Sequence, residues 1–241
     1  MNIDIKEYLN SRRFTVLWSG GKDSTATLLW ILDNIHHEKW NIVYVEVTGN
    51  THELCNKYIH ETAKELGVHH KLKHVKREDM DFFECLKRSG IPLPGKNRWC
   101  LTKFKIEVWE RFSNIIQVLG VRSRESRRRA LIFRKFTVMK KYQEHKIAIC
   151  PIFEWDKRRV IRYIREHEIS VNPCYQIYGH SGNCMFCPNH RVFQIVRTLN
   201  DPVWGQKILD ALLAQRGKNL QNLKTWIRFA SQKTITSYFS S

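Results

Sequence analysis

The sequence predicts an α/β protein: a parallel, Rossmann-like sheet flanked by helices, followed by a C-terminal cysteine loop and a helical cap. Short apolar, β-branched runs recur without clear alternation, as in strands buried on both faces. Segments with helical spacing of apolar residues lie between them, which is typical of βαβ units. After about residue 170, cysteines and loop-forming residues replace this pattern. We therefore expect one domain over residues 1–170 and a C-terminal subdomain over residues 171–241.

The expected elements alternate along the chain. The apolar runs that predict strands are residues 14–18, 41–47, 71–75, 114–121 and 146–152. The segments that predict helices are residues 24–35, residues 51–66 and a stretch that starts after Asp156. Gly67 is a suitable stop for the second helix, and Asp156 is a suitable N-cap for the third. In the cap, apolar stripes that contain Trp204 and Leu223 predict two further helices.

The composition indicates a folded protein with a basic surface. Of the 241 residues, 42% are hydrophobic and 12% aromatic, which excludes wholesale disorder. No apolar run approaches the ~20 residues that span a bilayer, and the first residues lack the apolar part of a secretory signal. We expect a cytoplasmic protein with no membrane partner. Lys plus Arg number 41 and Asp plus Glu 23, a net charge of +18, which favours a polyanionic partner such as nucleic acid or nucleotide phosphates.

A glycine-rich segment connects the first expected strand to the first expected helix, and it reads Ser19-Gly20-Gly21-Lys22-Asp23-Ser24. The two glycines allow a tight turn and close approach of the backbone to a ligand. The helix start offers unpaired N–H groups and a positive dipole end, which together bind phosphate. Lys22 adds a point charge, the serines offer hydroxyl groups, and Asp23 either holds Mg²⁺ or orients the loop. The spacing differs from a Walker A motif, but the segment predicts a phosphate-binding loop in which Lys22 and Asp23 are catalytic.

This segment resembles the PP-loop of the ATP pyrophosphatase (adenine nucleotide α-hydrolase) superfamily, whose members cleave ATP between the α and β phosphates. Later segments are similar to the branch that contains phosphoadenylylsulfate (PAPS) reductase. In order, they are Thr48-Gly49 with Glu53, Gly120-Val121-Arg122-Ser123-Arg124-Glu125-Ser126, Pro151-Ile152-Phe153-Glu154-Trp155 and Asn172-Pro173-Cys174-Tyr175. The resemblance covers roughly residues 14–190. It implies that ATP and Mg²⁺ bind to the loop and to Thr48, Gly49, Glu53, Gly120, Arg122, Glu125 and Arg129.

The arginine-rich segment also suggests a chemical role of its own. It follows an apolar strand directly, so it lies at the carboxyl end of that strand, where open α/β sheets bind ligands. Arg122 and Arg129 are suited to neutralise a triphosphate or a polyanionic acceptor. The alternative is a solvated, charged helix start. We predict Arg122 as a third catalytic residue beside Lys22 and Asp23.

The cysteines suggest a metal or cluster site. Their number, seven, is odd, which does not fit a disulfide scaffold. Cys184 and Cys187 form a CxxC that presents two thiolates to one metal or cluster. The CxxC follows a loop, which disfavours a thioredoxin-like redox motif. The candidate ligands are Cys100, Cys174, Cys184 and Cys187, with His180 or His190 in reserve for zinc, and the cysteines expected to be simply buried are Cys55, Cys85 and Cys150.

The resemblance favours a [4Fe–4S] cluster over zinc at these four cysteines. Adenylylsulfate reductases of this branch hold such a cluster with a cysteine pair and a distant CxxC. Cys100 precedes Cys184 by 84 residues, which is a similar separation. Trp99 stands where the first cysteine of the pair would be. Cys174 is therefore expected to supply the missing ligand.

The function that the resemblance implies is an ATP pyrophosphatase that adenylates an acceptor for sulfur transfer. Sulfonucleotide reductases of the branch carry a nucleophilic cysteine in a C-terminal tail, and no cysteine follows Cys187 here. The chain is closest in character to the ATP pyrophosphatase component of DNA phosphorothioation systems. The basic charge favours a nucleic-acid acceptor, DNA first and tRNA second, and a cysteine desulfurase would donate the sulfur. The alternatives are a PAPS or adenylylsulfate reductase and a non-catalytic nucleotide-sensing, DNA-binding module.

Overall fold

The computed structural model describes residues 4–92, 98–141 and 144–214. The chain divides into two compact units. Unit 1 comprises Met1–Val45, Asn56–Val75 and Val108–Asn172, and unit 2 comprises Glu46–Cys55, Lys76–Glu107 and Pro173–Ser241. The expected domain limit at residue 170 lies close to the limit at Asn172, but unit 2 also takes two earlier segments of the chain.

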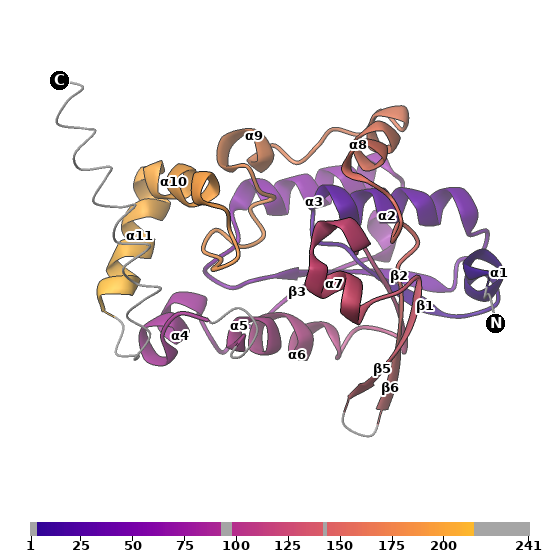
Figure 1. Ribbon diagram of the computed structural model, residues 1–241, viewed down its shortest axis with the longest axis horizontal. Helices are drawn as coiled ribbons and strands as arrows, with labels where there is room; N and C mark the ends of the chain where they lie inside the picture. The colour runs from indigo at the N-terminus through magenta and orange to yellow at the C-terminus, as the bar shows by residue number, and fades with distance from the viewer. Residues whose placement is uncertain (1–3, 93–97, 142–143, 215–241) are drawn as a thin grey trace. The chain divides into compact units, whose positions relative to one another are not determined.

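Unit 1 is built on a six-stranded sheet with the order β3-β2-β1-β4-β6-β5. The strands are β1 (Phe14–Leu17), β2 (Trp40–Glu46), β3 (Leu72–Lys76), β4 (Ile116–Leu119), β5 (Phe136–Lys141) and β6 (Glu144–Ile149). β1 runs parallel to β2 and β4, and β4 runs parallel to β6. The predicted α/β class is confirmed, and the predicted parallel sheet is confirmed except for its antiparallel edge strand β5. The sequence did not predict β5, which forms an antiparallel hairpin with β6 at the sheet edge (Figure 1).

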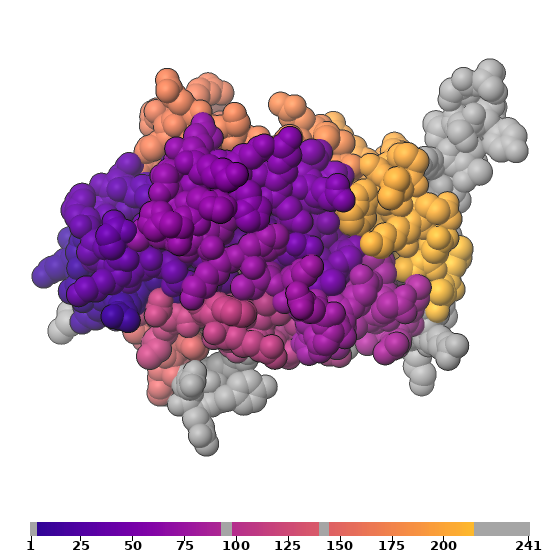
Figure 2. All heavy atoms as spheres, turned by 180° about the vertical axis from the view of Figure 1, so that it is seen from behind, coloured from indigo at the N-terminus to yellow at the C-terminus, as the bar shows by residue number. Residues whose placement is uncertain are grey.

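Three helices confirm the apolar spacing: α2 (Lys22–Asn34), α3 (Glu53–Glu65) and α8 (Lys157–Glu166). The sequence did not predict the short helices α1 (Ile5–Asn10), which precedes β1, and α7 (Arg127–Ile132). α2 and α8 pack together through a buried cluster that includes Leu29 and Ile164. Asp156 is the N-cap of α8, since its side chain accepts a hydrogen bond from the Arg159 N–H at 2.7 Å. The polar face of α3 is exposed, and Figure 2 shows the violet α3 region at the surface.

Unit 2 gathers short helices around an aromatic core. The helices are α4 (Phe82–Ser89), α5 (Trp99–Leu101), α9 (Cys174–Tyr178), α10 (Val192–Asn200) and α11 (Pro202–Leu213), with a π-helical turn at Thr102–Ile106. The short α6 (Glu107–Trp109) begins at the end of this segment, and its Val108 and Trp109 belong to unit 1. Phe82, Phe104 and Phe186 are buried at the centre of this core.

One buried asparagine explains why unit 2 takes an early segment of the chain. The Asn50 side chain accepts a hydrogen bond from the Phe186 N–H at 2.8 Å and donates one to the Phe186 carbonyl at 3.0 Å. This pairing joins the turn after β2 to the cysteine loop. The predicted C-terminal subdomain was continuous in sequence and did not include this turn. The predicted helix at Trp204 is confirmed as part of α11, whereas the one predicted at Leu223 lies outside the described residues. None of the described helices is long and apolar enough to cross a membrane.

Candidate nucleotide site

The predicted phosphate loop lies between β1 and α2 in unit 1. Gly21 is the N-cap of α2 and has no side chain to satisfy the first N–H groups of the helix, which leaves the end of the helix suited to an anion. The two serines brace the loop instead. The Ser19 N–H donates to Ser24 Oγ at 3.2 Å, and the Ser24 hydroxyl donates to the Gly21 carbonyl at 2.9 Å. The loop is therefore held in shape by its own hydroxyl groups.

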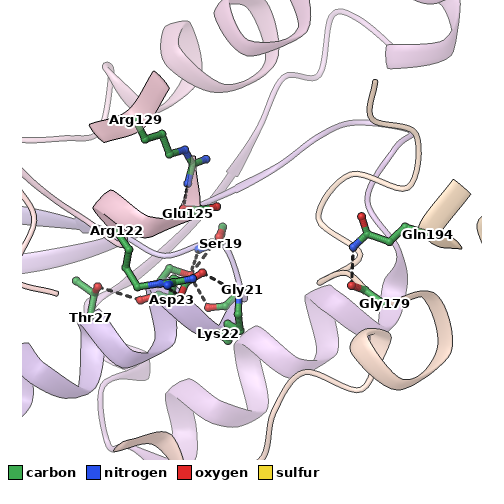
Figure 3. Close-up of polar contacts among 11 residues, drawn as sticks. Ser19, Gly21, Lys22, Asp23, Thr27, Arg122, Glu125, Arg129, Gly179 and Gln194 are labelled. Atoms are coloured by element: carbon green, nitrogen blue, oxygen red, sulfur yellow. Dashed lines mark hydrogen bonds and ion pairs between the residues drawn. The ribbon is translucent and has the colours of Figure 1, made fainter. Parts of the chain in front are cut away.

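Two cations hold the carboxylate of Asp23. Arg122 Nε donates to Asp23 Oδ1 at 2.6 Å, and Lys22 Nζ donates to Asp23 Oδ2 at 2.8 Å. The exposed fractions of the Arg122 and Asp23 side chains are only 6% and 12%, so water screens this pair weakly. Figure 3 shows the Arg122 side chain extending from the segment after β4 to Asp23 at the start of α2. The structure thus brings the three predicted catalytic residues into one cluster.

Gly120 and Asn172 fix the loop from two other segments of unit 1. A Cβ at Gly120 would lie 2.6 Å from the backbone N and Cα of Ser24, so only glycine fits without displacing α2. The buried Asn172 side chain donates to the Gly20 carbonyl at 3.1 Å. Asn172 was not among the predicted site residues. Its only signal in the sequence was the Asn-Pro turn, one of the motifs that carry the family resemblance.

Glu125 and Arg129, predicted to bind the nucleotide, pair with each other. Arg129 Nη1 donates to Glu125 Oε2, and both residues are exposed (Figure 3). Ser126 caps α7 by accepting a hydrogen bond from the Arg129 N–H at 3.1 Å. The pair follows Arg122 by a few residues on the same segment and is exposed, whereas Arg122 is buried.

Thr48, Gly49 and Glu53 belong to unit 2. The Thr48 hydroxyl donates to the Arg77 carbonyl, and the Gly49 carbonyl accepts from Lys207 Nζ at 2.8 Å. Gly49 has a φ of +79°, and a Cβ there would lie 1.9 Å from Asp81 Oδ2. Glycine is therefore required at this turn. Glu53 is an exposed residue in the first turn of α3.

Three of the four predicted cysteine ligands, Cys100, Cys184 and Cys187, lie in unit 2, where Cys100 and Cys184 pack against the same core. Burial raises the pKa of Cys100 to about 11, with a smaller contribution from the thiols of Cys184 and Cys187. Burial and Cys184 likewise raise the pKa of Cys187. Cys174 packs elsewhere in unit 2, with Tyr178 and Met185. Its pKa is raised to about 12, first by burial and then by Cys55.

The arrangement of the cysteines does not match the expected metal group. Among the described residues, no three His, Cys, Asp or Glu side chains are arranged so that they could hold a metal ion. In the part of the chain that the structure describes, one buried side-chain atom nevertheless lacks a partner: His190 Nδ1 is inaccessible to solvent and makes no hydrogen bond there. The His190 N–H donates to the Cys187 carbonyl at 3.0 Å, which places this histidine next to the CxxC. The predicted four-cysteine site is not formed as the side chains stand.

A mostly parallel sheet with a glycine-rich loop between its first strand and α2 is consistent with the adenine nucleotide α-hydrolase-like fold. The chain belongs to the phosphoadenosine phosphosulfate reductase domain family, whose sequence pattern matches residues 13–189.

The similar solved structures have low sequence identity to this chain. PAPS reductase from Candida auris, solved as a phosphate complex, is 17% identical with a TM-score of 0.47, and the match covers 73% of this chain and 93% of that one. FMN adenylyltransferase from Candida glabrata, solved with FAD and inorganic pyrophosphate, is 14% identical with a TM-score of 0.45. That match covers 68% of this chain and only about half, 52%, of the adenylyltransferase. Among curated proteins, none matches this sequence.

Proposed function

We propose that this protein binds ATP at the Ser19–Ser24 loop and transfers its adenylyl group to an acceptor, which then receives sulfur. The observation that carries the proposal is the Asp23 carboxylate held between Lys22 and Arg122 at the start of α2. This arrangement puts two cations at the N-terminus of α2, where they and the helix dipole would stabilise the negative charge of a polyphosphate. The proposal extends to nucleic acid as the acceptor, with DNA phosphorothioation first and tRNA thiolation second.

The residues divide the work of the adenylyl transfer. An acceptor oxygen attacks the α phosphorus, the bond from that phosphorus to the bridging oxygen of the β phosphate breaks, and pyrophosphate leaves with the electron pair. Lys22 exchanges Asp23 for the β and γ phosphates, and Arg122 keeps Asp23 in place. Bound Mg²⁺ would add charge neutralisation, and Asp23 is the carboxylate of the loop that would hold it. The chemistry therefore depends on positioning and charge stabilisation.

The sulfur-transfer step predicts a chemical mark on nucleic acid. DNA and tRNA from cells with and without the gene would be digested and compared by mass spectrometry. We expect a sulfur-containing nucleotide, heavier by the difference between sulfur and oxygen, only when the gene is present. Its loss in Lys22→Ala cells would support the proposal, and identical nucleotide profiles in all cells would refute it.

The family match favours one second function, a sulfonucleotide reductase. This alternative predicts release of sulfite from PAPS or adenylylsulfate in the presence of a thiol donor. Sulfite release that is robust and lost in Lys22→Ala would establish the reductase. Pyrophosphate release from ATP without any sulfite would exclude it.

A [4Fe–4S] cluster, with zinc as the alternative, is a separate part of the proposal. Its support is the set of interacting thiols Cys100, Cys184 and Cys187 together with the unpaired His190 Nδ1 beside them. Thiolates are the usual ligands of both iron–sulfur clusters and structural zinc. No step of the adenylyl transfer is assigned to this group.

A further inference from the structure

A hollow lined entirely by charged side chains lies in unit 1. Its volume is about 490 Å³, and the lining residues are Arg124, Glu154, Asp156, Arg158, Arg159 and Arg162. Arg124 comes from the turn after β4, and the other arginines come from α8. All four arginines are exposed. Guanidinium groups gathered around an open space are the usual protein partners of phosphate.

The two acidic residues of the hollow have other partners. Glu154 pairs with Lys135 at 2.7 Å. Asp156 accepts the Arg159 N–H as the cap of α8, and this hydrogen bond lowers the pKa of Asp156 below its usual value. The arginines exceed the acids four to two. Asp156 also interacts electrostatically with Arg124 and Arg158, and Arg162 lies 3.7 Å from Glu166. The hollow has a net positive charge that its own acidic residues leave unbalanced.

The arginines at the start of α8 are not there to stabilise this helix. The first turn of α8 holds three cations, Lys157, Arg158 and Arg159, and no acidic residue. Cations at a helix N-terminus are repelled by the helix dipole, so this turn opposes the stability of the helix. Arg159 gains some stability from the ring of Trp155, 4.3 Å from its guanidinium carbon. A bound polyanion would offset the remaining repulsion.

The hollow adjoins the nucleotide site within the same unit. Arg124 is two residues beyond Arg122, which binds Asp23. Between them, the Ser123 N–H and hydroxyl both donate to the Phe153 carbonyl, at 2.8 and 3.0 Å. These bonds fasten the Arg122 segment to the segment that leads into α8. The hollow is therefore joined, through two residues of one fastened segment, to the arginine that binds Asp23.

We propose that this arginine-lined hollow binds the phosphate backbone of the nucleic acid that accepts the adenylyl group. The inference rests on the proposed function and names its substrate class. An extended polyanion fits better than a single phosphate because exposed arginines continue beyond the hollow, at Arg127 and Arg128 on α7. The net charge of +18 supplies the long-range attraction that such a strand requires.

The test measures nucleic-acid binding in the absence of ATP. Fluorescence anisotropy would follow a labelled DNA duplex of about two helical turns, the corresponding single strand and a tRNA over a range of salt concentrations. The variant Arg158→Ala/Arg162→Ala removes two cations of the hollow. The control Lys57→Ala/Arg111→Ala removes two exposed cations elsewhere in unit 1, and Arg111 precedes β4 whereas Arg124 follows it. Circular dichroism and ATP affinity would confirm that both variants are folded.

We expect the hollow variant to bind nucleic acid about ten-fold more weakly, with a salt slope smaller by about two, while the control binds nearly as the wild type does. Equal losses in both variants would overturn the inference, because the binding would then follow net charge alone. A hollow variant that loses binding only to anionic phosphatidylserine vesicles would also overturn it.

Pyrophosphate release separates this inference from the proposed function. If the hollow variant releases pyrophosphate normally and binds nucleic acid as the wild type does, the hollow is rejected as a nucleic-acid site, and the proposed function is kept. If the wild type never releases pyrophosphate but the hollow variant still loses nucleic-acid binding, the hollow is kept as a binding site and the proposed function is rejected.

Discussion

Arg122 Nε lies 2.6 Å from Asp23 Oδ1, in a buried ion pair that joins the carboxyl end of β4 to the first turn of α2. The two residues are 99 positions apart in sequence. Their contact sets the position of the phosphate loop relative to the arginine-rich segment. Lys22 shares the same carboxylate, so these two cations and one anion leave the cluster with a net charge of +1.

Removing Arg122 should therefore lower the free energy of unfolding. Arg122→Ala leaves a buried carboxylate with only Lys22, and losing one partner of a buried pair costs about 3–5 kcal/mol. The double variant Asp23→Asn/Arg122→Met leaves no unpaired buried carboxylate and should be destabilised less. Urea unfolding of the two variants and the wild type measures the difference. A double variant less stable than Arg122→Ala would show that the uncompensated carboxylate is not the cause of the loss.

Gly120→Ala should displace the start of α2, because the new methyl group would lie 2.6 Å from Ser24 backbone atoms. Overpacking of this kind costs about 1–3 kcal/mol, and a loop shifted by that much strain should bind ATP roughly ten-fold more weakly. Gly67→Ala is the comparison, since a Cβ there meets nothing within 4 Å and only its φ of +69° strains the backbone. Isothermal titration calorimetry should show ATP affinity lost in Gly120→Ala and kept in Gly67→Ala. Equal affinities would mean that the close approach to Ser24 is not required.

His167 should make stability depend on pH. Burial lowers the pKa of His167, but hydrogen bonds to the Tyr163 carbonyl and to Asp33 outweigh it and raise the pKa above its usual value. The stabilisation is fully present below the unfolded pKa of about 6.5 and is lost as pH rises through the higher folded pKa. His167→Gln should remove this component of the pH dependence. The free energy of unfolding of the wild type and of His167→Gln would be measured from about pH 5.5 to about pH 9. The same pH dependence in both proteins would show that the His167–Asp33 pair does not contribute.

Cysteine substitutions should separate the candidate ligands from the buried thiols. Cys184→Ser should lose most of the bound iron or zinc, and so should His190→Ala if its unpaired Nδ1 completes the site. Cys150→Ser is the matched control, because Cys150 is buried in unit 1, with a pKa raised to about 12 by burial. Anaerobic purification followed by metal analysis and absorbance near ~400 nm tests this directly. Equal metal content in Cys184→Ser and the wild type would show that the CxxC holds no metal.

Local patterns in the sequence were enough to predict much of the fold. The strand–loop–helix around Gly21 follows from apolar runs and turn residues, and the carboxyl-end rule places Arg122 near it. The Asp23–Arg122 pair itself is a long-range contact that spacing does not reveal. β5 was missed because its run, Phe136–Lys141, ends in polar residues and pairs only at the sheet edge.

The cysteine ligand set was hardest to predict because short motifs do not determine the tertiary positions of distant side chains. Cys100 and Cys184 pack against the same core in unit 2, whereas Cys174 packs with Tyr178 and Met185 from its position at the start of α9. Asn172, two residues earlier, belongs to the same motif and holds the phosphate loop. The Asn-Pro turn marked Asn172 only as part of the family resemblance and did not reveal its contact with the Gly20 carbonyl.

The products formed from ATP decide whether the protein transfers an adenylyl group. Purified protein would be incubated with ATP labelled at the α phosphate, with and without DNA or tRNA, alongside Lys22→Ala and the control Lys57→Ala. We expect pyrophosphate, and label transferred to the nucleic acid or released as AMP, reduced about 100-fold in Lys22→Ala and retained in Lys57→Ala. Release of ADP and phosphate, or the absence of pyrophosphate under every condition, would rule out adenylyl transfer at this loop.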